Sequence, residues 1–320
     1  MIWIKRLFIP IIVFFFTIII FFSTEFILSK YVGLGQPVVY DPHLLWGYSP
    51  KPNKVYNRFK NNTVTINNIG LRSQKNWNTK EKNILFLGDS VTYGGSYISD
   101  EETFVSIACN KLTDWNCHNG GVNAYGILNI VARSNYDKRF QNDSIRVFTF
   151  ITADFSRGLQ KSSAAHFILR DPPNIFPAIW EATNFVVAKL NIISWFGKKK
   201  SDKVLLPEEF SDQQKMAESF ALEIFLNEID NLKKSGKDFI LIHSPSKLEL
   251  SNAKSLNENF IIKTLLNEFP EEFIMLSETA LKNYRENYDG IFYDDQHYSK
   301  KGHQIVGKFI NNILEEKIYK

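Results

Sequence analysis

The sequence predicts an α/β fold with a parallel central sheet, preceded by one N-terminal transmembrane helix. Two observations carry this prediction. In residues 83–320, apolar strand patterns alternate with single helical patterns, which favours parallel strands joined by right-handed crossovers. In residues 1–30, an apolar run reaches the length that a helix needs to cross a bilayer.

The apolar run extends from Leu7 to Leu28, which is about 33 Å of helix at about 1.5 Å per residue. A cleaved signal peptide is the alternative, because a charged start and an apolar run occur in both. A signal peptide has a shorter apolar region and small residues at its cleavage site, and this run is long and lacks such a site. We therefore predict an uncleaved anchor in residues 1–30, with a short cytoplasmic tip.

Charges on either side of the run predict its orientation. Lys5 and Arg6 precede it and only Lys30 follows closely, so the amino end is expected in the cytoplasm. Glu25 is expected near the outer interface, where its charge reaches the lipid headgroups. The bulk of the chain is thus predicted to lie in the periplasm or on the cell surface.

The composition excludes several classes of function. The 38 basic and 34 acidic residues nearly balance, whereas a nucleic-acid-binding protein needs a clustered basic face. A hydrophobic share of 44% with 22% charged residues is typical of a globular core and not of a disordered chain. Cys109 and Cys117 are too few for a zinc site of four ligands or a disulfide framework. Outside the cytoplasm they form either one disulfide or two buried thiols.

Residues 31–82 are predicted to be a juxtamembrane stalk or lead-in segment, because only residues 64–66 alternate like a strand. Strand and helix patterns follow in turn after this segment. The predicted strands are residues 83–87, 115–118, 145–151, 239–243 and 273–276. The predicted helices are residues 101–112, 127–140 and 214–234, and a last helix that starts at residue 300.

An insertion at about residues 155–212 interrupts the alternation. It contains Pro172, Pro173 and Pro177, a run of lysines at residues 198–200, and a partly helical aromatic stretch between them. Such a segment is either a lid over a substrate or a helix packed on the edge of the domain, and the sequence leaves both open.

The first motif with chemical content is Gly88, Asp89 and Ser90, directly after an apolar strand. A serine at the carboxyl end of a strand that opens a helix lies where backbone N–H groups can hold a developing oxyanion. The alternative is an ordinary turn with an Asp–Ser cap. A phosphate-binding P-loop is excluded, since the Gly-Lys-Ser/Thr ending is missing.

The second motif is Asp294-Asp295-Gln296-His297, just before the last helix. His297 in this place can take the proton of a serine, and a carboxylate three residues earlier can hold its other ring nitrogen. Asp294 has that spacing. A metal site of Asp294, Asp295, His297 and His303 is the alternative, which no companion ligand pattern supports.

The third motif is the glycine-rich segment at residues 119–126, between a short strand and a helix. Its glycines, Gly121 among them, can present a backbone N–H towards the serine. A simple glycine-rich turn is the equal alternative.

With these motifs in this order, residues 83–320 resemble the SGNH (GDSL-like) hydrolase superfamily. The matching segments read GDSVTYG, NGGVNAYG and DDQH, and INNIGLR upstream is similar to the lead-in of membrane-anchored bacterial members. The resemblance implies a three-layer α/β/α flavodoxin-like fold. It implies Ser90 as nucleophile, His297 as base and Asp294 as the residue that orients the base. It also implies an oxyanion hole that is made by the backbone N–H groups of Ser90 and Gly121.

One segment departs from the family pattern Gly-x-Asn-Asp. After the central strand the sequence reads ITADF, so Asp154 matches the last Asp and Ala153 takes the place of the oxyanion asparagine. Asp89, Asn123, Ala153 and Asp154 are therefore candidates that line the site. Either another group replaces the asparagine, or the enzyme is slow, or the fold is retained without catalysis.

The resemblance implies a serine esterase or O-acyltransferase outside the cytoplasm. Its expected substrate is an acyl ester, such as an acetyl ester, of a cell-surface glycan, and its intermediate is an acyl-serine. No cofactor, metal or nucleic acid is expected, and the membrane is contacted through the N-terminal helix. A lipase or thioesterase, and a catalytically weak component of surface-polysaccharide assembly, are the alternatives.

Overall fold

A parallel sheet occupies the centre of the molecule. A computed structural model of the chain describes residues 2–59, 62–140, 142–161, 171–189 and 207–319. Among these residues, the central sheet is 5-stranded with the order β6-β5-β7-β8-β9, and all of its neighbouring pairs are parallel. The strands are β5 (Lys82–Gly88), β6 (Trp115–Gly121), β7 (Ile145–Phe150), β8 (Asp238–His243) and β9 (Phe273–Met275). In chain order this is the 2-1-3-4-5 arrangement of flavodoxin-like folds.

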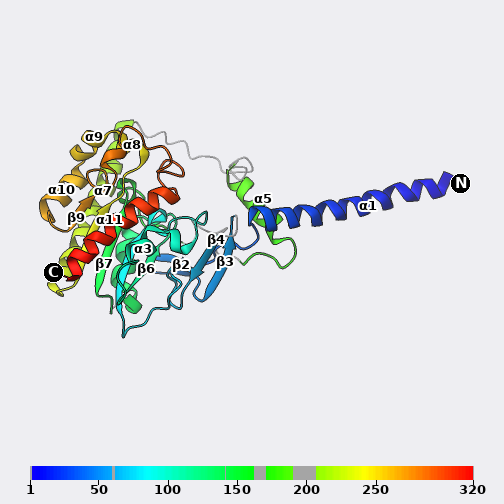
Figure 1. The fold of residues 1–320 in the computed structure, drawn as a ribbon. Coiled ribbons are helices and arrows are strands. Elements are labelled where there is room, and N and C mark those ends of the chain that lie inside the picture. Colours follow the sequence, from blue (N-terminus) through cyan, green and yellow to red (C-terminus); the bar gives the residue numbers. More distant parts are fainter. Residues whose placement is uncertain (1, 60–61, 141, 162–170, 190–206, 320) are drawn as a thin grey trace.

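Helices cover both faces of the sheet, because alternate residues of each strand point to opposite faces. Leu85 and Leu87 of β5 belong to one core with α4 (Ile127–Tyr136), α7 (Pro207–Lys234) and α10 (Phe260–Glu268). Ile84 and Phe86 belong to a second core with α3 (Phe104–Ala108) and α11 (Lys300–Tyr319). Figure 1 shows α11 crossing the sheet on the side of α3. The predicted three-layer α/β/α fold is thus confirmed.

Short elements complete the domain. They are α2 (Ser90–Tyr93), α8 (Lys247–Ser251), α9 (Ala253–Glu258) and the 3₁₀ turns Asp100–Glu102, Lys138–Phe140, Thr152–Phe155 and Lys282–Tyr284. In a sheet of this order, ligands bind where neighbouring connections leave the sheet in opposite directions. Here that point lies between the carboxyl ends of β5 and β7.

The predicted helix at residues 101–112 is the element that differs most from its expected bounds. The structure has a 3₁₀ turn at Asp100–Glu102 and then the short α3, which ends before Cys109. Cys109 and Cys117 are joined by a disulfide that ties the end of α3 to β6. Of the two alternatives for these cysteines, the structure has the disulfide.

Residues 31–82 hold more structure than the single strand-like piece that the sequence indicates. β1 (Tyr40–His43) pairs antiparallel with β2 (Gly47–Pro50), and β3 (Lys54–Arg58) pairs with β4 (Asn62–Ile66). Tyr40, Tyr48, Val64 and Ile66 are buried in the same core as α4 and α7. The strands are too short for a clear alternating pattern, and their aromatic side chains pack on the domain instead of standing free.

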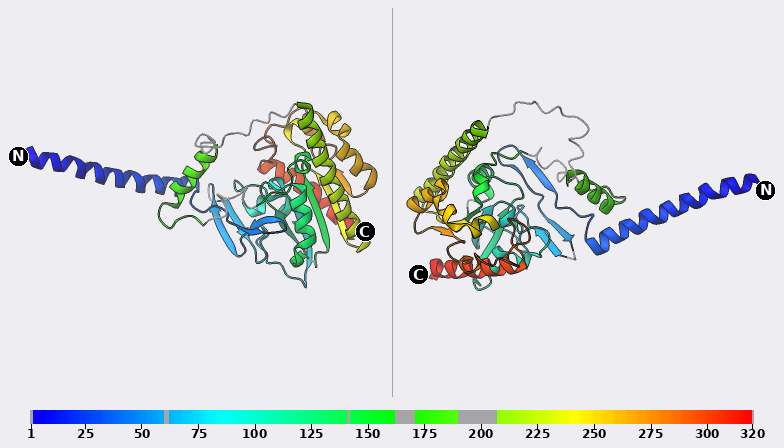
Figure 2. Two further views of the ribbon diagram at one scale, coloured as in Figure 1. Left: turned by 180° about the vertical axis from the view of Figure 1, so that it is seen from behind. Right: turned by 90° about the horizontal axis from the view of Figure 1, so that it is seen from above.

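The N-terminal helix projects from this unit. α1 (Ile2–Ile27) continues into a π-helical turn at Leu28–Val32, and the two views of Figure 2 show α1 extending away from the sheet. Ile9–Val32 is long and apolar enough to cross a membrane. A transmembrane span and a signal sequence both have this property. α5 (Pro177–Lys189), the described helix of the predicted insertion, lies beside the end of α1. Residues 162–170 and 190–206 of that insertion lie outside the described residues.

Candidate active site

Ser90 lies on a tight turn between β5 and α2. The Asp89 carboxylate caps the short helix by accepting the Val91 N–H at 2.8 Å. Gly88 is required before it, since a Cβ at this position would lie 2.0 Å from Thr92 Oγ1 and 2.4 Å from the Thr149 carbonyl oxygen. The turn therefore presents the half-buried Ser90 at the carboxyl edge of the sheet.

His297 reaches Ser90 from the segment before α11. Its Nε2 lies 2.8 Å from Ser90 Oγ, and its Nδ1 lies 2.7 Å from Asp294 Oδ2. A carboxylate on Nδ1 places the imidazole proton there and leaves Nε2 as the acceptor of the serine hydroxyl. The structure thus brings together the three side chains that the sequence analysis selected as nucleophile, base and orienting acid.

Asp294 is held by the backbone that follows it. Partial burial raises the pKa of this carboxyl, but the N–H groups of His297 and Gln296 and the His297 side chain outweigh it, and the net pKa is lowered. The two backbone bonds, at 2.8 and 2.9 Å, both go to Oδ1 and leave Oδ2 for the imidazole. Asp294 therefore remains ionised near neutral pH.

The segment around His297 is fixed by contacts on both of its sides. Tyr293 N–H donates to the His297 carbonyl oxygen at 2.8 Å, which closes a tight loop. The Tyr97 ring stacks on Tyr293 with centroids 3.9 Å apart, and its hydroxyl donates to the Tyr298 carbonyl oxygen at 2.8 Å. These contacts hold the imidazole over Ser90.

His303 faces the core and not the site. Its Nδ1 accepts the Phe104 N–H at 3.1 Å, and burial lowers its pKa to about 3. The Asp295 side chain points into solvent, 98% exposed. The alternative metal site therefore does not form from these residues, and no cluster of three or more metal-ligating side chains occurs among the residues that the structure describes.

The predicted donor Gly121 is engaged elsewhere. Its N–H donates to Asn119 Oδ1 at 2.9 Å, and Asn119 Nδ2 in turn donates to the Thr92 carbonyl oxygen at 2.7 Å. A Cβ at Gly121 would lie 2.3 Å from the Tyr93 backbone nitrogen, so this glycine serves the close approach of β6 and α2. The Gly121 N–H is thus not directed at Ser90, because it is hydrogen-bonded to the Asn119 side chain.

The other candidate lining residues on this side differ in what they contact. Asn123 Nδ2 donates to the Tyr40 hydroxyl at 3.1 Å, so its side chain is directed to the N-terminal strands. Ala124, the next residue, is exposed and has a φ of 64°, which is unusual for a residue other than glycine. Ala153 is exposed on the 3₁₀ turn after β7 and has no side-chain donor.

Asp89 and Asp154 are both buried and share Arg157. Arg157 Nη1 donates to Asp154 Oδ1 at 2.7 Å and to Asp89 Oδ2 at 3.2 Å. It also donates to the Tyr125 carbonyl oxygen at 2.9 Å, so it joins three loops behind Ser90. Burial, together with the Asp89 charge, raises the pKa of Asp154 well above its ordinary value. The sequence analysis missed Arg157; its only signal in the sequence was its position three residues after the candidate acid Asp154.

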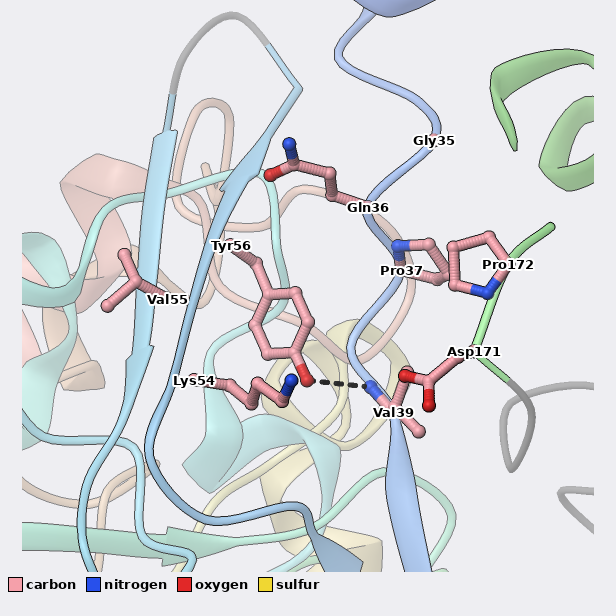
Figure 3. A pocket seen from close by; sticks show the side chains of 9 residues that line it. All are labelled: Gly35, Gln36, Pro37, Val39, Lys54, Val55, Tyr56, Asp171 and Pro172. Atoms are coloured by element: carbon pink, nitrogen blue, oxygen red, sulfur yellow. Dashed lines mark hydrogen bonds between the residues drawn. The ribbon is translucent and has the colours of Figure 1, made fainter. Parts of the chain in front are cut away.

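A separate cavity of about 240 Å³ lies away from Ser90, between residues 35–39, β3 and residues 171–172. Figure 3 shows Tyr56 directed across it, with its hydroxyl accepting the Val39 N–H at 3.2 Å. None of its lining residues belongs to the segments that carry Ser90, His297 or Arg157.

Comparison with known proteins finds similarity only at the level of structure. No family model and no curated protein matches the chain. A lipase/acylhydrolase from Enterococcus faecalis is similar with a TM-score of 0.43 and 14% identity, over 74% of this chain and 96% of its own. A two-domain esterase active on acetylated mannans has a TM-score of 0.45 and 15% identity, over 75% of this chain and 50% of its own. A catalytic mutant of an acetylxylan esterase from Geobacillus stearothermophilus has a TM-score of 0.43 and 13% identity, over 72% and 93%.

The order of the strands and the order of the motifs are independent of these similarities. The strand order is that of flavodoxin-like folds, the Gly-Asp-Ser turn follows the first strand of the sheet, and the Asp-x-x-His segment precedes the last helix. By this fold and this order of motifs, the chain is similar to the SGNH (GDSL-like) hydrolases.

Proposed function

We propose that the protein is a serine esterase or O-acyltransferase. The observation that carries the proposal is the chain of contacts from Ser90 Oγ through His297 to Asp294, at 2.8 and 2.7 Å. These three groups in this geometry form the arrangement that activates a serine for attack on an acyl carbon.

In the proposed reaction, Ser90 Oγ attacks the carbonyl carbon of the ester while His297 Nε2 takes the hydroxyl proton. The tetrahedral intermediate collapses, the bond to the alcohol oxygen breaks, and His297 gives that oxygen the proton. An acyl-serine remains. Water or a sugar hydroxyl then attacks it with His297 as base, which releases the acid or the acylated sugar and restores Ser90. Asp294 stabilises the imidazolium in both steps.

The oxyanion side of this mechanism has fewer donors than the family pattern implies. The Ser90 backbone N–H is the donor that we assign to the oxyanion. Gly121 donates to Asn119, and Ala153 has no side-chain donor. Loss of one such donor costs on the order of 10²–10³ in rate in a serine protease. We infer a slow enzyme, unless its substrate supplies the missing contact.

We place the reaction outside the cytoplasm, on acetyl or other acyl esters of a cell-surface glycan. Three features support this: Lys5 and Arg6 before the apolar run of α1, the similarity of INNIGLR to membrane-anchored members, and the disulfide of Cys109 and Cys117. We assign residues 1–30 to the anchor, 31–82 to a lead-in that packs on the domain, and 83–320 to the hydrolase domain.

A fluorophosphonate probe tests this proposal directly, because it labels a serine only where a base has activated it. We expect labelling of the wild type and none of Ser90→Ala. We also expect the variant to lose hydrolysis of a short p-nitrophenyl ester while its melting temperature changes by only a few degrees. Unchanged hydrolysis in Ser90→Ala would refute the serine mechanism.

A second candidate is a catalytically weak component of surface-polysaccharide assembly with an esterase fold. Ala153 and the engaged Gly121 N–H favour it. A wild-type protein that is inert both to the probe and to esters would select this candidate.

A further inference from the structure

Glu25, the acidic residue within the apolar segment, has a partner in the protein. Its carboxylate accepts the Ala178 N–H and the Ile179 N–H, both at 2.9 Å. These are N–H groups of the first turn of α5, which have no acceptor inside that helix. Glu25 therefore caps α5 from a position about 150 residues earlier in the chain, instead of pointing to headgroups.

Two further contacts hold α5 between α1 and the domain. On the α1 side, the Phe176 ring packs on Phe21 and Phe22, with centroids 5.9 and 5.2 Å apart. On the domain side, Glu181 accepts two bonds from Arg58, at 2.6 and 3.0 Å. Defined side-chain contacts thus join α5 to α1 on one side and to the domain on the other. We call residues 171–189, which include α5, the bracket between the anchor and the domain.

The chain segments next to this bracket also run together. Glu181 accepts the Gly35 N–H at 2.6 Å, and a Cβ at Gly35 would lie 3.1 Å from the Ala178 nitrogen. Figure 3 shows the segment that leaves α1 at Gly35–Val39 next to Asp171 and Pro172, which lead into α5. The exit from α1 and the entry into α5 are therefore adjacent.

The bracket exposes large apolar side chains. Ile175, Phe185 and Val186 are 72%, 65% and 51% exposed. Phe22 and Phe26 of α1 are exposed at the same level along the helix as Glu25. Trp180 in α5 and the exposed Tyr31 after α1 are residue types that are enriched where a bilayer meets water.

We propose that α5 lies in the interfacial layer of the bilayer, with Ile175, Phe185 and Val186 at the boundary of the acyl chains. This inference rests on the proposed anchoring through α1. Glu25 lies near the outer end of the apolar segment Ile9–Val32, so a helix that it caps must begin at that depth. A lipid surface is the occupant that fits, because it is continuous with the surroundings of Phe22 and Phe26 on α1. The bracket then sets the height and tilt of the Ser90 site above the membrane.

Depth-dependent quenching tests the proposal on the full chain in phosphatidylethanolamine–phosphatidylglycerol vesicles. Phe185→Cys takes an environment-sensitive fluorophore selectively, because Cys109 and Cys117 are paired in a disulfide. We expect a blue-shifted emission that lipids with a nitroxide at a shallow position quench. Asn312→Cys, on the exposed face of α11 far from α1, is the matched control and should show neither effect.

The role of Glu25 is tested in the same assay. Glu25→Gln removes the charge and one acceptor, so we expect the label at position 185 to lose its shallow quenching, while the chain still floats with the vesicles. Thr17→Val is the control, because the Thr17 hydroxyl bonds only within α1, to the Val13 carbonyl oxygen at 2.8 Å. It should leave the quenching unchanged.

The outcomes separate this inference from the proposed anchoring. A chain that does not float with vesicles overturns the anchoring, and the inference with it. A chain that floats while the label is quenched no more than at position 312 overturns the inference alone. A label that is shielded from lipid nitroxides but cross-links between copies would show that a second copy covers α5. Unchanged quenching in Glu25→Gln would refute the inference that the Glu25 cap holds α5 at its depth in the bilayer.

Discussion

The two sides of Ser90 use charged groups in opposite ways. On the His297 side, the side chains of His297 and Asp294 are 26% and 48% exposed, and the imidazole links Asp294 on one ring nitrogen to Ser90 on the other. On the Arg157 side, the carboxylates of Asp89 and Asp154 are fully buried and are joined by one guanidinium. The first side is open to a substrate and can exchange a proton with it. The second is a structural clamp, formed by Arg157, Asp89 and Asp154, whose charged groups bond to one another.

The difference teaches that similar residues beside a nucleophile serve either chemistry or packing according to their burial. Asp294 has a lowered pKa, so it can stabilise an imidazolium. Asp154 has a raised pKa because it is buried next to Asp89, so it suits the interior of the clamp. His297 and His303 repeat the contrast, since only His297 reaches Ser90.

The largest effect is expected from Asp294→Asn. The amide cannot hold the imidazole in the tautomer that accepts the Ser90 proton, and the equivalent change in a serine protease lowers kcat about 10⁴-fold. We expect a loss of that order in ester hydrolysis with an unchanged melting temperature, since the side chain is half exposed. Asp295→Asn is the matched control, and equal losses in both variants would contradict the assignment.

Arg157→Ala is expected to have the next largest effect, and on stability. It leaves two buried carboxyl groups without their cation, and breaking a buried ion pair costs about 3 kcal/mol or more. Urea unfolding in detergent measures the change. Arg139→Ala serves as the control and should cost about 1 kcal/mol or less, because the Arg139 side chain is 38% exposed and Asp137 keeps Arg133 at 3.8 Å. Equal losses of unfolding free energy in the two variants would contradict a larger contribution of Arg157 to stability.

His303 predicts a dependence of stability on pH. Its pKa is about 3 in the folded chain against an ordinary 6.5, so below pH 6.5 the unfolded chain binds a proton that the folded chain does not. The contribution of the neutral His303 to the unfolding free energy is therefore fully present above about pH 6.5 and is lost as the pH falls towards 3. At pH 5 the loss is about 2 kcal/mol. The difference in unfolding free energy between wild type and His303→Gln should shrink by that amount between about pH 7.5 and pH 5. A difference that does not change with pH would contradict the burial of a neutral imidazole.

Ala153→Asn gives the smallest expected effect and tests the missing donor. A recovered oxyanion hydrogen bond is worth up to about 2.7–4 kcal/mol in a serine protease. We expect less, about a tenfold rise in kcat, because the neighbouring residues do not hold the new side chain in place. A folded variant that is no faster than wild type would show that another group already serves the oxyanion.

Much of the His297 side was predictable from the sequence, and less of the Arg157 side was. Asp294 and His297 are three residues apart, so their contact follows from local geometry. Ser90 could be placed near them because the loops after parallel strands meet at one edge of the sheet. The partner of Gly121 was not predictable in the same way, since a glycine-rich segment reads alike whether its N–H faces a substrate or the Asn119 side chain. Arg157 gave too weak a signal to be chosen among the other basic residues.

The sequence by itself determined the apolar strands, the layers on the two faces of the sheet and the apolar N-terminal helix, because burial leaves a periodic hydrophobic pattern in the chain. Only the tertiary structure decided that Glu25 caps α5, that Arg157 joins Asp89 to Asp154, and that His303 turns into the core. Each of these depends on a hydrogen-bond partner or a packing neighbour. A polar side chain takes whichever partner the folded backbone brings within about 3 Å, and the local pattern of residues carries no record of that choice.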